Sequence, residues 1–316
     1  MTNCHDLFEK FHAKIELSEI KKDNLRISRG SIRKRIKKHF LEVRKDSAPK
    51  FKGQGSYRMG TIVNPLPNEE YDIDDGVYLQ NLPLEKKDWP ATETVHKWIS
   101  EAVKDKTEAD PIDKAACVRV VYANDYHVDL PAYGIYQDIA YLAVKGEKQW
   151  VMSEPIKLAN WFNAKVDNKG NQLRKVVRYL KAWADKQNRK MPNGLILSVL
   201  SCDHYKIDQR EDIAFSQMVE GIYSAVKDSF VVINPINVAE RLTDRLSSEQ
   251  KDNFSEAIKR LAENSRKALE LNSKRDASKI WQKEFGDRFP IVEDGIETIN
   301  SRKVTIVCPV RPHCED

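Results

Sequence analysis

Two acidic residues at alternate positions of a predicted β-strand constrain this chain more than any other feature. In YDIDDGVYL, residues 71–79, apolar residues alternate with Asp72 and Asp74. Successive side chains of a strand point to opposite faces, so both carboxylates are expected on one side and Asp75 on the other face or in a turn. A third acid, Asp129, lies on the predicted strand YHVDL and is expected to reach the same sheet face as the first two.

Three carboxylates on neighbouring strands predict a magnesium site. Mg²⁺ prefers one or two carboxylates together with water and phosphate oxygens. Nucleotidyl transfer needs the charge of the transferring phosphate neutralised, and two ions held by shared carboxylates do this. We therefore predict two Mg²⁺ ions. Asp72 and Asp74 hold the ion that carries a triphosphate, and Asp129 joins them at the second ion, where it orients or deprotonates the attacking hydroxyl.

A glycine-rich segment, FKGQGSYRMGT at 51–61, precedes the acidic strand. Glycine lets backbone N–H groups approach phosphates closely, and the Ser56 hydroxyl can bond a β- or γ-phosphate oxygen. The acids and this segment together predict nucleotidyl transfer from a nucleoside triphosphate.

The run QGSYRMGTIVNP, followed by YDIDDGVYL and later by HVDLPAY, resembles the polymerase-β-like nucleotidyltransferase superfamily, whose mark is a Gly-Ser loop before an hDhDh strand. More narrowly, the chain resembles the bacterial cGAS/DncV-like nucleotidyltransferases (CD-NTases), which are cyclic-oligonucleotide synthases of anti-phage signalling. The segments RKVVRYLKAWAD and PNGLILSVL also fit their pattern. The resemblance spans most of the chain.

The resemblance implies a site and a reaction. Gln54, Gly55 and Ser56 would contact the donor nucleotide, and Lys181 and Ser198 would touch its triphosphate. One nucleoside triphosphate (ATP, with GTP or a pyrimidine triphosphate as further candidates) donates its nucleotidyl group to a hydroxyl of another, and pyrophosphate leaves. A second turnover closes a cyclic di- or trinucleotide, the second messenger of CBASS defence. An activating or conjugating protein is a further candidate partner.

The apolar patterns predict an α+β chain. Residues 1–153 are expected to form a small mixed α/β unit, with an amphipathic basic helix from Ser31 to about Val43. Residues 154–316 have the helical period and end in a short, poorly ordered tail. By resemblance, this is a polymerase-β-like palm with a mixed β-sheet, an N-terminal spine helix that contains SIRKRIKKHF, and a mainly helical C-terminal lobe.

Composition limits the remaining alternatives. The 53 basic and 48 acidic residues give a net charge of +5, which suits an anionic small ligand, so nucleic acid is not the expected partner. The basic helix at 31–40 keeps polynucleotide binding open as an alternative. No apolar run is long enough to span a membrane and no secretory signal is present, so we expect a cytoplasmic protein.

The five cysteines favour reduced thiols, because they are odd in number and never spaced as CxxC. Cys202 with His204, and Cys308 with His313 and Cys314, each lack the second pair that would complete a zinc site.

Three interpretations stay open. Arg174, Arg178 and Lys181 form one basic helical stripe, either a triphosphate clamp or a solvated face. A transferase acting on an RNA end or a small molecule would use the same three acids. A non-catalytic module is disfavoured, because crowded carboxylates cost stability unless a cation offsets them.

Overall fold

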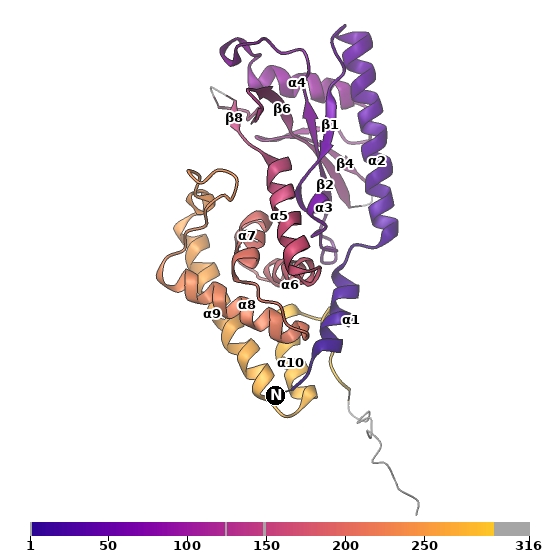
Figure 1. Ribbon diagram of the computed structural model, residues 1–316. Helices are drawn as coiled ribbons and strands as arrows, with labels where there is room; N and C mark the ends of the chain where they lie inside the picture. The colour runs from indigo at the N-terminus through magenta and orange to yellow at the C-terminus, as the bar shows by residue number, and fades with distance from the viewer. Residues whose placement is uncertain (1, 124, 148–149, 294–316) are drawn as a thin grey trace, which may run out of the picture.

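The computed structural model describes residues 2–123, 125–147 and 150–293, which form a mixed β-sheet beside a bundle of helices (Figure 1). The strands are β1 Lys50–Gly53, β2 Tyr71–Tyr78, β3 Ile112–Asp113, β4 Val118–Tyr122, β5 Tyr126–Leu130, β6 Ala132–Tyr136, β7 Ile139–Leu142 and β8 Val151–Met152. Their order in the sheet is β3-β4-β5-β2-β6-β7-β8, and β1 pairs with β2. The predicted α+β class is confirmed.

Along the chain, helices precede the strands, lie between them and follow them. They are α1 His5–Ile15, α2 Glu19–Lys38, a π-helix His39–Val43, α3 Gly55–Met59, a 3-10 helix Lys86–Asp88, α4 Thr92–Val103, α5 Pro155–Lys169, α6 Gln172–Asp185, α7 Gly194–His204, α8 Glu211–Asp228, a 3-10 helix Leu242–Arg245, α9 Ser248–Glu270 and α10 Lys274–Phe285. Helices α5 to α10 form the predicted helical lobe (Figure 1).

The spine helix α2 is longer than predicted. It begins at Glu19 rather than at Ser31, and the Ser18 hydroxyl caps it by accepting a hydrogen bond from the Lys21 backbone N–H. Its buried stripe is narrow, consisting of Leu25, Ser28, Ile32 and Ile36. Ile20 and Ile27, in the first half of the helix, are 76% and 71% exposed. The positions of these isoleucines therefore do not show which face of the helix packs against the sheet.

The N-terminal helix α1 packs with the helical lobe and not with the sheet. Leu7, Phe8, Phe11 and Ile15 belong to the same apolar core as α6, α8 and α10. The Phe8 ring meets Tyr179 edge-on at a centroid distance of 5.2 Å and Trp281 at 4.9 Å. The first residues thus lie with the lobe that we predicted from residue 154 onward, and the two-domain division stays a prediction.

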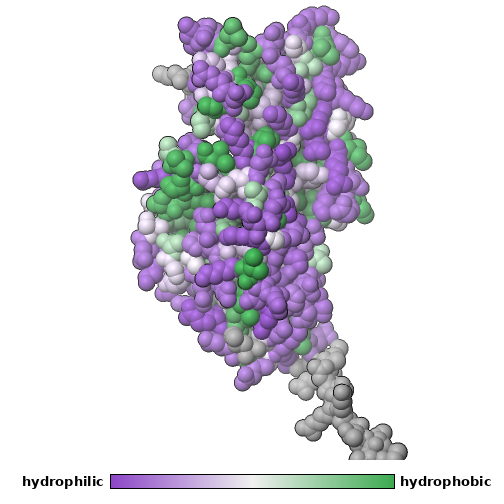
Figure 2. Space-filling view, viewed as in Figure 1, coloured by the Kyte–Doolittle hydropathy of each residue, from purple (hydrophilic) through white to green (hydrophobic). Residues whose placement is uncertain are grey.

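The surface and the cysteines agree with the composition. The face seen in Figure 2 is mostly hydrophilic, with apolar side chains in separate patches. In the described part of the chain, no helix combines the length and apolar character needed to cross a membrane. Cys4, Cys117 and Cys202 are buried free thiols. The predicted tail, with Cys308, His313 and Cys314, lies outside the described residues.

Asp75 lies on the strand face opposite to Asp72 and Asp74, as predicted. It is completely buried, and Arg33 of α2 pairs with it, donating from Nε to Oδ2 at 2.6 Å. The ion pair joins the spine helix to the strand that carries the acidic motif.

Asp75→Asn is expected to destabilise the protein by on the order of 2 kcal/mol, because it leaves the Arg33 charge without its carboxylate in a mostly desolvated position. Glu19→Gln is the matched control, since Glu19 pairs with Lys22 at the surface and such pairs contribute less than about 1 kcal/mol. Urea unfolding of the two variants measures the difference. Equal stabilities would contradict a role for the buried pair.

Candidate active site

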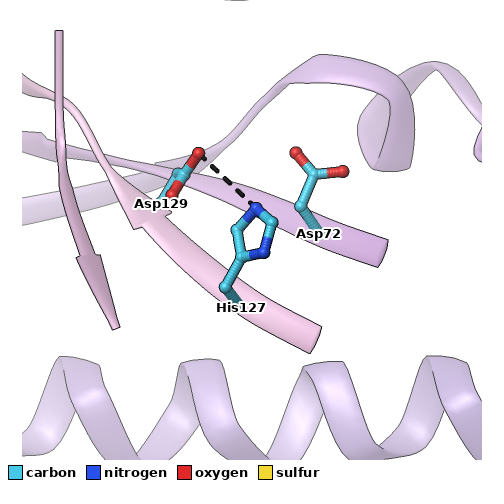
Figure 3. A group of neighbouring side chains, drawn as sticks. All are labelled: Asp72, His127 and Asp129. Carbon is cyan, nitrogen blue, oxygen red and sulfur yellow. Dashed lines mark ion pairs between the residues drawn. The ribbon is translucent and has the colours of Figure 1, made fainter. Parts of the chain in front are cut away.

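The pairing of β2 with β5 brings the three predicted carboxylates together. The strands are parallel, and their register sets Asp72 opposite His127 and Asp74 opposite Asp129. Residues two apart on a strand share a face, so these four side chains form two short rows on one side of the sheet. Figure 3 shows the three side chains of Asp72, His127 and Asp129 as neighbours on one side of the strands, with the His127 ring directed toward Asp129.

Burial and mutual repulsion make this cluster costly without a cation. Burial raises the pKa of Asp74 to about 7, and the charges of Asp72 and Asp129 add to the shift. Burial also raises the pKa of Asp72, while His127 acts in the opposite direction. Asp72 and Asp74, which are half-buried and resist ionisation, lie beside the buried Asp129, and such a group of carboxylates fits a divalent cation that all three would hold.

One guanidinium offsets part of the negative charge. Arg119 of β4 lies opposite Asp129 in the β4–β5 hairpin and donates two hydrogen bonds to its carboxylate, both at 2.7 Å. The two planar groups form a bidentate pair, which fixes the Asp129 side chain toward the site.

Gly55 fits against the acidic strand in a way that no other residue can. Its φ is +63°, and an added Cβ would lie 2.0 Å from Asp74 Oδ2. The backbone N–H of the preceding Gln54 donates to the Asp74 carbonyl at 3.1 Å. The Gly-Ser segment is thus held directly against the second acid of the motif.

A cavity of about 550 Å³ opens beside the acids. Its lining includes Ser56, Asp72 and Lys181, and among the others are Asp185 and Gly194. The cavity therefore brings together a hydroxyl donor, a carboxylate and a cation from three separated parts of the chain.

Lys181 reaches this cavity from α6 with its side chain almost fully buried. Its ammonium donates to Thr61 Oγ1 at 3.1 Å. Burial lowers the pKa of Lys181 to about 8, although the carboxylates of Asp185, Asp72 and Asp74 act in the opposite direction. Gly194 makes room for it, because a Cβ there would lie 3.1 Å from Lys181 Cε.

A second cavity of about 480 Å³ lies on the other side of the Gly-Ser segment. It is lined by Gln54, Tyr133 and Ser153 and, across from them, by Asn234 and Asn237. Gln54 Nε2 donates to the Tyr133 hydroxyl at 3.1 Å, and Gln54 Oε1 is buried without a hydrogen-bond partner among the described residues. Of the three predicted residues of this segment, Gln54 thus lines one cavity and Ser56 the other.

The cavity that Lys181 reaches is not lined by Arg174, Arg178 or Ser198. Arg174 donates to the Met59 carbonyl at 3.1 Å, and Arg178 contacts His12 and Glu16 of α1. Neither residue is a phosphate clamp or a solvated face, so both interpretations of this stripe were wrong for them. The Ser198 hydroxyl donates to the Gly194 carbonyl at 2.6 Å within α7, and its contact with a triphosphate stays a prediction that this geometry does not support.

Three residues of the site were not predicted, although the sequence carries a signal for each. His127 precedes Asp129 by two positions and so shares its strand face. Arg119 can be found from the hairpin register. Tyr122 pairs with Tyr126 beside the turn, and three residues away from the turn on each strand this register sets Arg119 opposite Asp129. Asp185 lies one helical turn after Lys181 and lines the same cavity.

Comparisons with known proteins agree with this geometry. Residues 49–133 match the family model described as "Cyclic GMP-AMP synthase DncV-like, nucleotidyltransferase domain". A cyclic GMP-AMP synthase of Escherichia coli is 26% identical over 185 residues, which cover 44% of this chain and 43% of that protein. A c-di-GMP synthase of Roseivirga ehrenbergii is 22% identical over 60% of this chain and 59% of its own length. The chain thus aligns with less than half of the first relative and with about three-fifths of the second.

The fold agrees over a longer stretch. The apo structure of Vibrio cholerae DncV superposes with a TM-score of 0.79 at 21% identity, covering 91% of this chain and 96% of that one. The DncV complex with the linear intermediate 5' pppA(3',5')pG gives a TM-score of 0.78 at 20% identity, with the same coverage of both chains. The fold and the acidic face of the sheet are those of a polymerase-β-like nucleotidyltransferase. Within that class, the proteins to which the chain is similar are the bacterial cGAS/DncV-like nucleotidyltransferases, the CD-NTases, and the family model itself matches residues 49–133.

Gly55→Ala is expected to lower the free energy of unfolding by about 2 kcal/mol or more, because the new methyl group meets Asp74 and the backbone is left-handed there. Gly30→Ala is the control, since no atom lies within 4 Å of a Cβ at this position of α2. There, alanine should stabilise the helix by about 0.5–1 kcal/mol. Chemical denaturation of both variants tests the close approach, and a neutral Gly55→Ala would refute it.

Asp74→Asn is expected to stabilise the metal-free protein at pH 8. The pKa of Asp74 in the folded protein, about 7, lies above its unfolded value of about 3.9, so the folded state binds this proton more tightly. The free energy of unfolding therefore falls as the pH rises from about 4 to about 7, and asparagine removes this loss.

Thermal unfolding in EDTA measures this effect. The Tm of Asp74→Asn should exceed that of the wild type at pH 8, and the difference should shrink toward pH 5. The exposed Asp167→Asn serves as the control. If the Tm of Asp74→Asn and that of the wild type changed in parallel with pH, the pKa of Asp74 would not be raised in the folded protein.

Proposed function

We propose that this chain is a Mg²⁺-dependent nucleotidyltransferase that joins nucleoside triphosphates into a cyclic di- or trinucleotide and releases pyrophosphate. The observation that carries the proposal is the parallel register of β2 and β5, which sets Asp74 opposite Asp129 on the face that carries Asp72. A nucleotide second messenger of anti-phage CBASS signalling is the product class that its family relationship suggests.

The lining of the first cavity supports a triphosphate substrate. The Ser56 hydroxyl can donate to a phosphate oxygen, and the Lys181 ammonium can neutralise phosphate charge from the opposite wall. Mg²⁺ held by Asp72, Asp74 and Asp129 would supply charge neutralisation on the transferring phosphate. The position of Asp129 on the neighbouring strand suits it to orient the attacking hydroxyl of the acceptor nucleotide.

The reaction exchanges a phosphoanhydride bond of the donor for a new phosphoester bond to the acceptor, whose hydroxyl loses its proton. The acceptor hydroxyl oxygen bonds to the α-phosphorus of the donor, the bond to the β-phosphate oxygen breaks, and pyrophosphate leaves. Two cavities of about 550 and 480 Å³, one lined by Ser56 and the other by Gln54, offer room for parts of a nucleotide.

The relatives support the same reaction class. Those that match by sequence are described as cyclic GMP-AMP and c-di-GMP synthases, and one DncV structure holds a linear dinucleotide intermediate. ATP and GTP are accordingly the first substrates to test for this chain.

Incubation with all four nucleoside triphosphates and Mg²⁺, followed by phosphatase treatment and mass spectrometry, tests the proposal. A phosphatase-resistant cyclic oligonucleotide is the expected product. Asp72→Asn and Asp129→Asn are expected to abolish its formation while leaving the circular dichroism spectrum unchanged, because each removes a charged ligand.

Other outcomes select other functions. Label transferred to RNA ends or to a small-molecule acceptor, without any cyclic product, would indicate the alternative transferase. Undiminished turnover in either aspartate variant would contradict the assignment of the site, and no turnover with any acceptor would favour a non-catalytic module.

A further inference from the structure

We propose that His127 is a ligand of the metal site and gives that site a preference for Mn²⁺ over Mg²⁺. The inference rests on the proposed function only in taking Asp72 and Asp129 as metal ligands. It adds a nitrogen donor to a site that the sequence motif describes as purely acidic.

The distances allow one ion to be shared. One ligand atom each from Asp72, His127 and Asp129 lies within 4.8 Å of the others (Figure 3). Two ligands of one ion, each bonded at about 2.1 Å, lie about 3–4 Å apart, so small side-chain rotations are enough to close the group around an ion. The register of β2 and β5 holds the His127 and Asp72 side chains close together, because it sets these two residues directly opposite each other.

The imidazole is oriented as in many metal-binding histidines. Its Nδ1 lies 2.9 Å from Glu70 Oε2, and a carboxylate can only accept this hydrogen bond, so the proton is on Nδ1. In the neutral imidazole, which is the form that binds a metal, the lone pair is then on Nε2, which lies 3.9 Å from Asp129 Oδ2, beyond hydrogen-bond distance. A carboxylate on the outer nitrogen is the usual means of fixing the ring of a ligating histidine.

Burial excludes solvent as the main partner of this nitrogen. The His127 residue is only 6% exposed, and its ring points toward the acidic row instead of away from it. A buried ring with a free lone pair beside two carboxylates is suited to a cation.

The hydrogen bonds that Asp129 accepts from Arg119 explain why a nitrogen ligand would strengthen the metal site. Both of its oxygens already accept hydrogen bonds from Arg119 at 2.7 Å, which leaves only their remaining lone pairs for a cation. Mg²⁺ is a hard cation that binds oxygen donors and gives up its waters reluctantly, so an imidazole nitrogen adds less to its affinity than to that of Mn²⁺, a first-row transition metal. The site would therefore discriminate between the two ions.

Electron spin-echo envelope modulation of bound Mn²⁺ tests this ligand directly. The full chain is labelled with ¹⁵N-histidine and mixed with Mn²⁺ and α,β-methylene ATP, so that the adenine nitrogens of the analogue cannot produce a ¹⁵N signal. A ¹⁵N coupling is expected in the wild type and should be lost in His127→Gln. His5→Gln is the control and should keep the coupling, because His5 lies on α1, away from the sheet.

Affinities give a second readout. His127→Gln should weaken Mn²⁺ binding by about tenfold while changing Mg²⁺ binding by less than about threefold. If His127→Gln does not fold, His127→Asn takes its place, and the wild-type spectrum still decides whether a histidine is bound.

The outcomes separate this inference from the proposed function. Bound Mn²⁺ and normal cyclic product without ¹⁵N coupling would overturn the His127 assignment alone, and so would a coupling that persists in His127→Gln. Absence of both Mn²⁺ binding and product would overturn the proposed function together with it.

Discussion

The parallel pairing of β2 with β5 is the contact on which the site depends. A shift of one residue in this register would turn Asp72 and Asp74 to the opposite sheet face. That face is closed by the spine helix, where Ile73 and Val128 are buried in one apolar core and Asp75 pairs with Arg33. The packing of α2 thus opposes any slip of the strand, and the acidic row is held in position by contacts on the opposite side of the sheet.

Holding these acids together has a cost that the surrounding residues reduce but do not remove. Arg119 neutralises Asp129, and Lys181 lies close enough to Asp72 and Asp74 to favour their charged forms. Burial still outweighs these attractions, since the pKa of Asp74 is raised. An ion-free state that is strained in this way gives a cation a larger binding free energy, because binding relieves repulsion that the fold has already imposed.

Local periodicity predicted the parts of this structure that depend on one segment. The alternation at 71–75 placed Asp72 and Asp74 on one face and Asp75 on the other, and the helical period placed the second lobe. Strand pairing and helix neighbours are not local, so the partners of Asp129 were not predicted, although the hairpin register would have given Arg119. The same limit explains the error at Arg174 and Arg178, since a helical period shows which residues share a face but not what lies opposite them.

Those two arginines explain how a residue of the helical lobe reaches a site on the sheet. Arg174 binds the carbonyl of Met59, at the end of the Gly-Ser segment, and Arg178 binds Glu16 before the spine helix. Both contacts fix α6 against chain that leads directly into the nucleotidyltransferase core. Lys181 lies one turn beyond Arg178 on the same helix, so its distance from Asp72 is set by these bonds. The three basic residues of the predicted stripe therefore divide into Arg174 and Arg178, which position the helix, and Lys181, which faces the cavity, although all three share one stripe in the sequence.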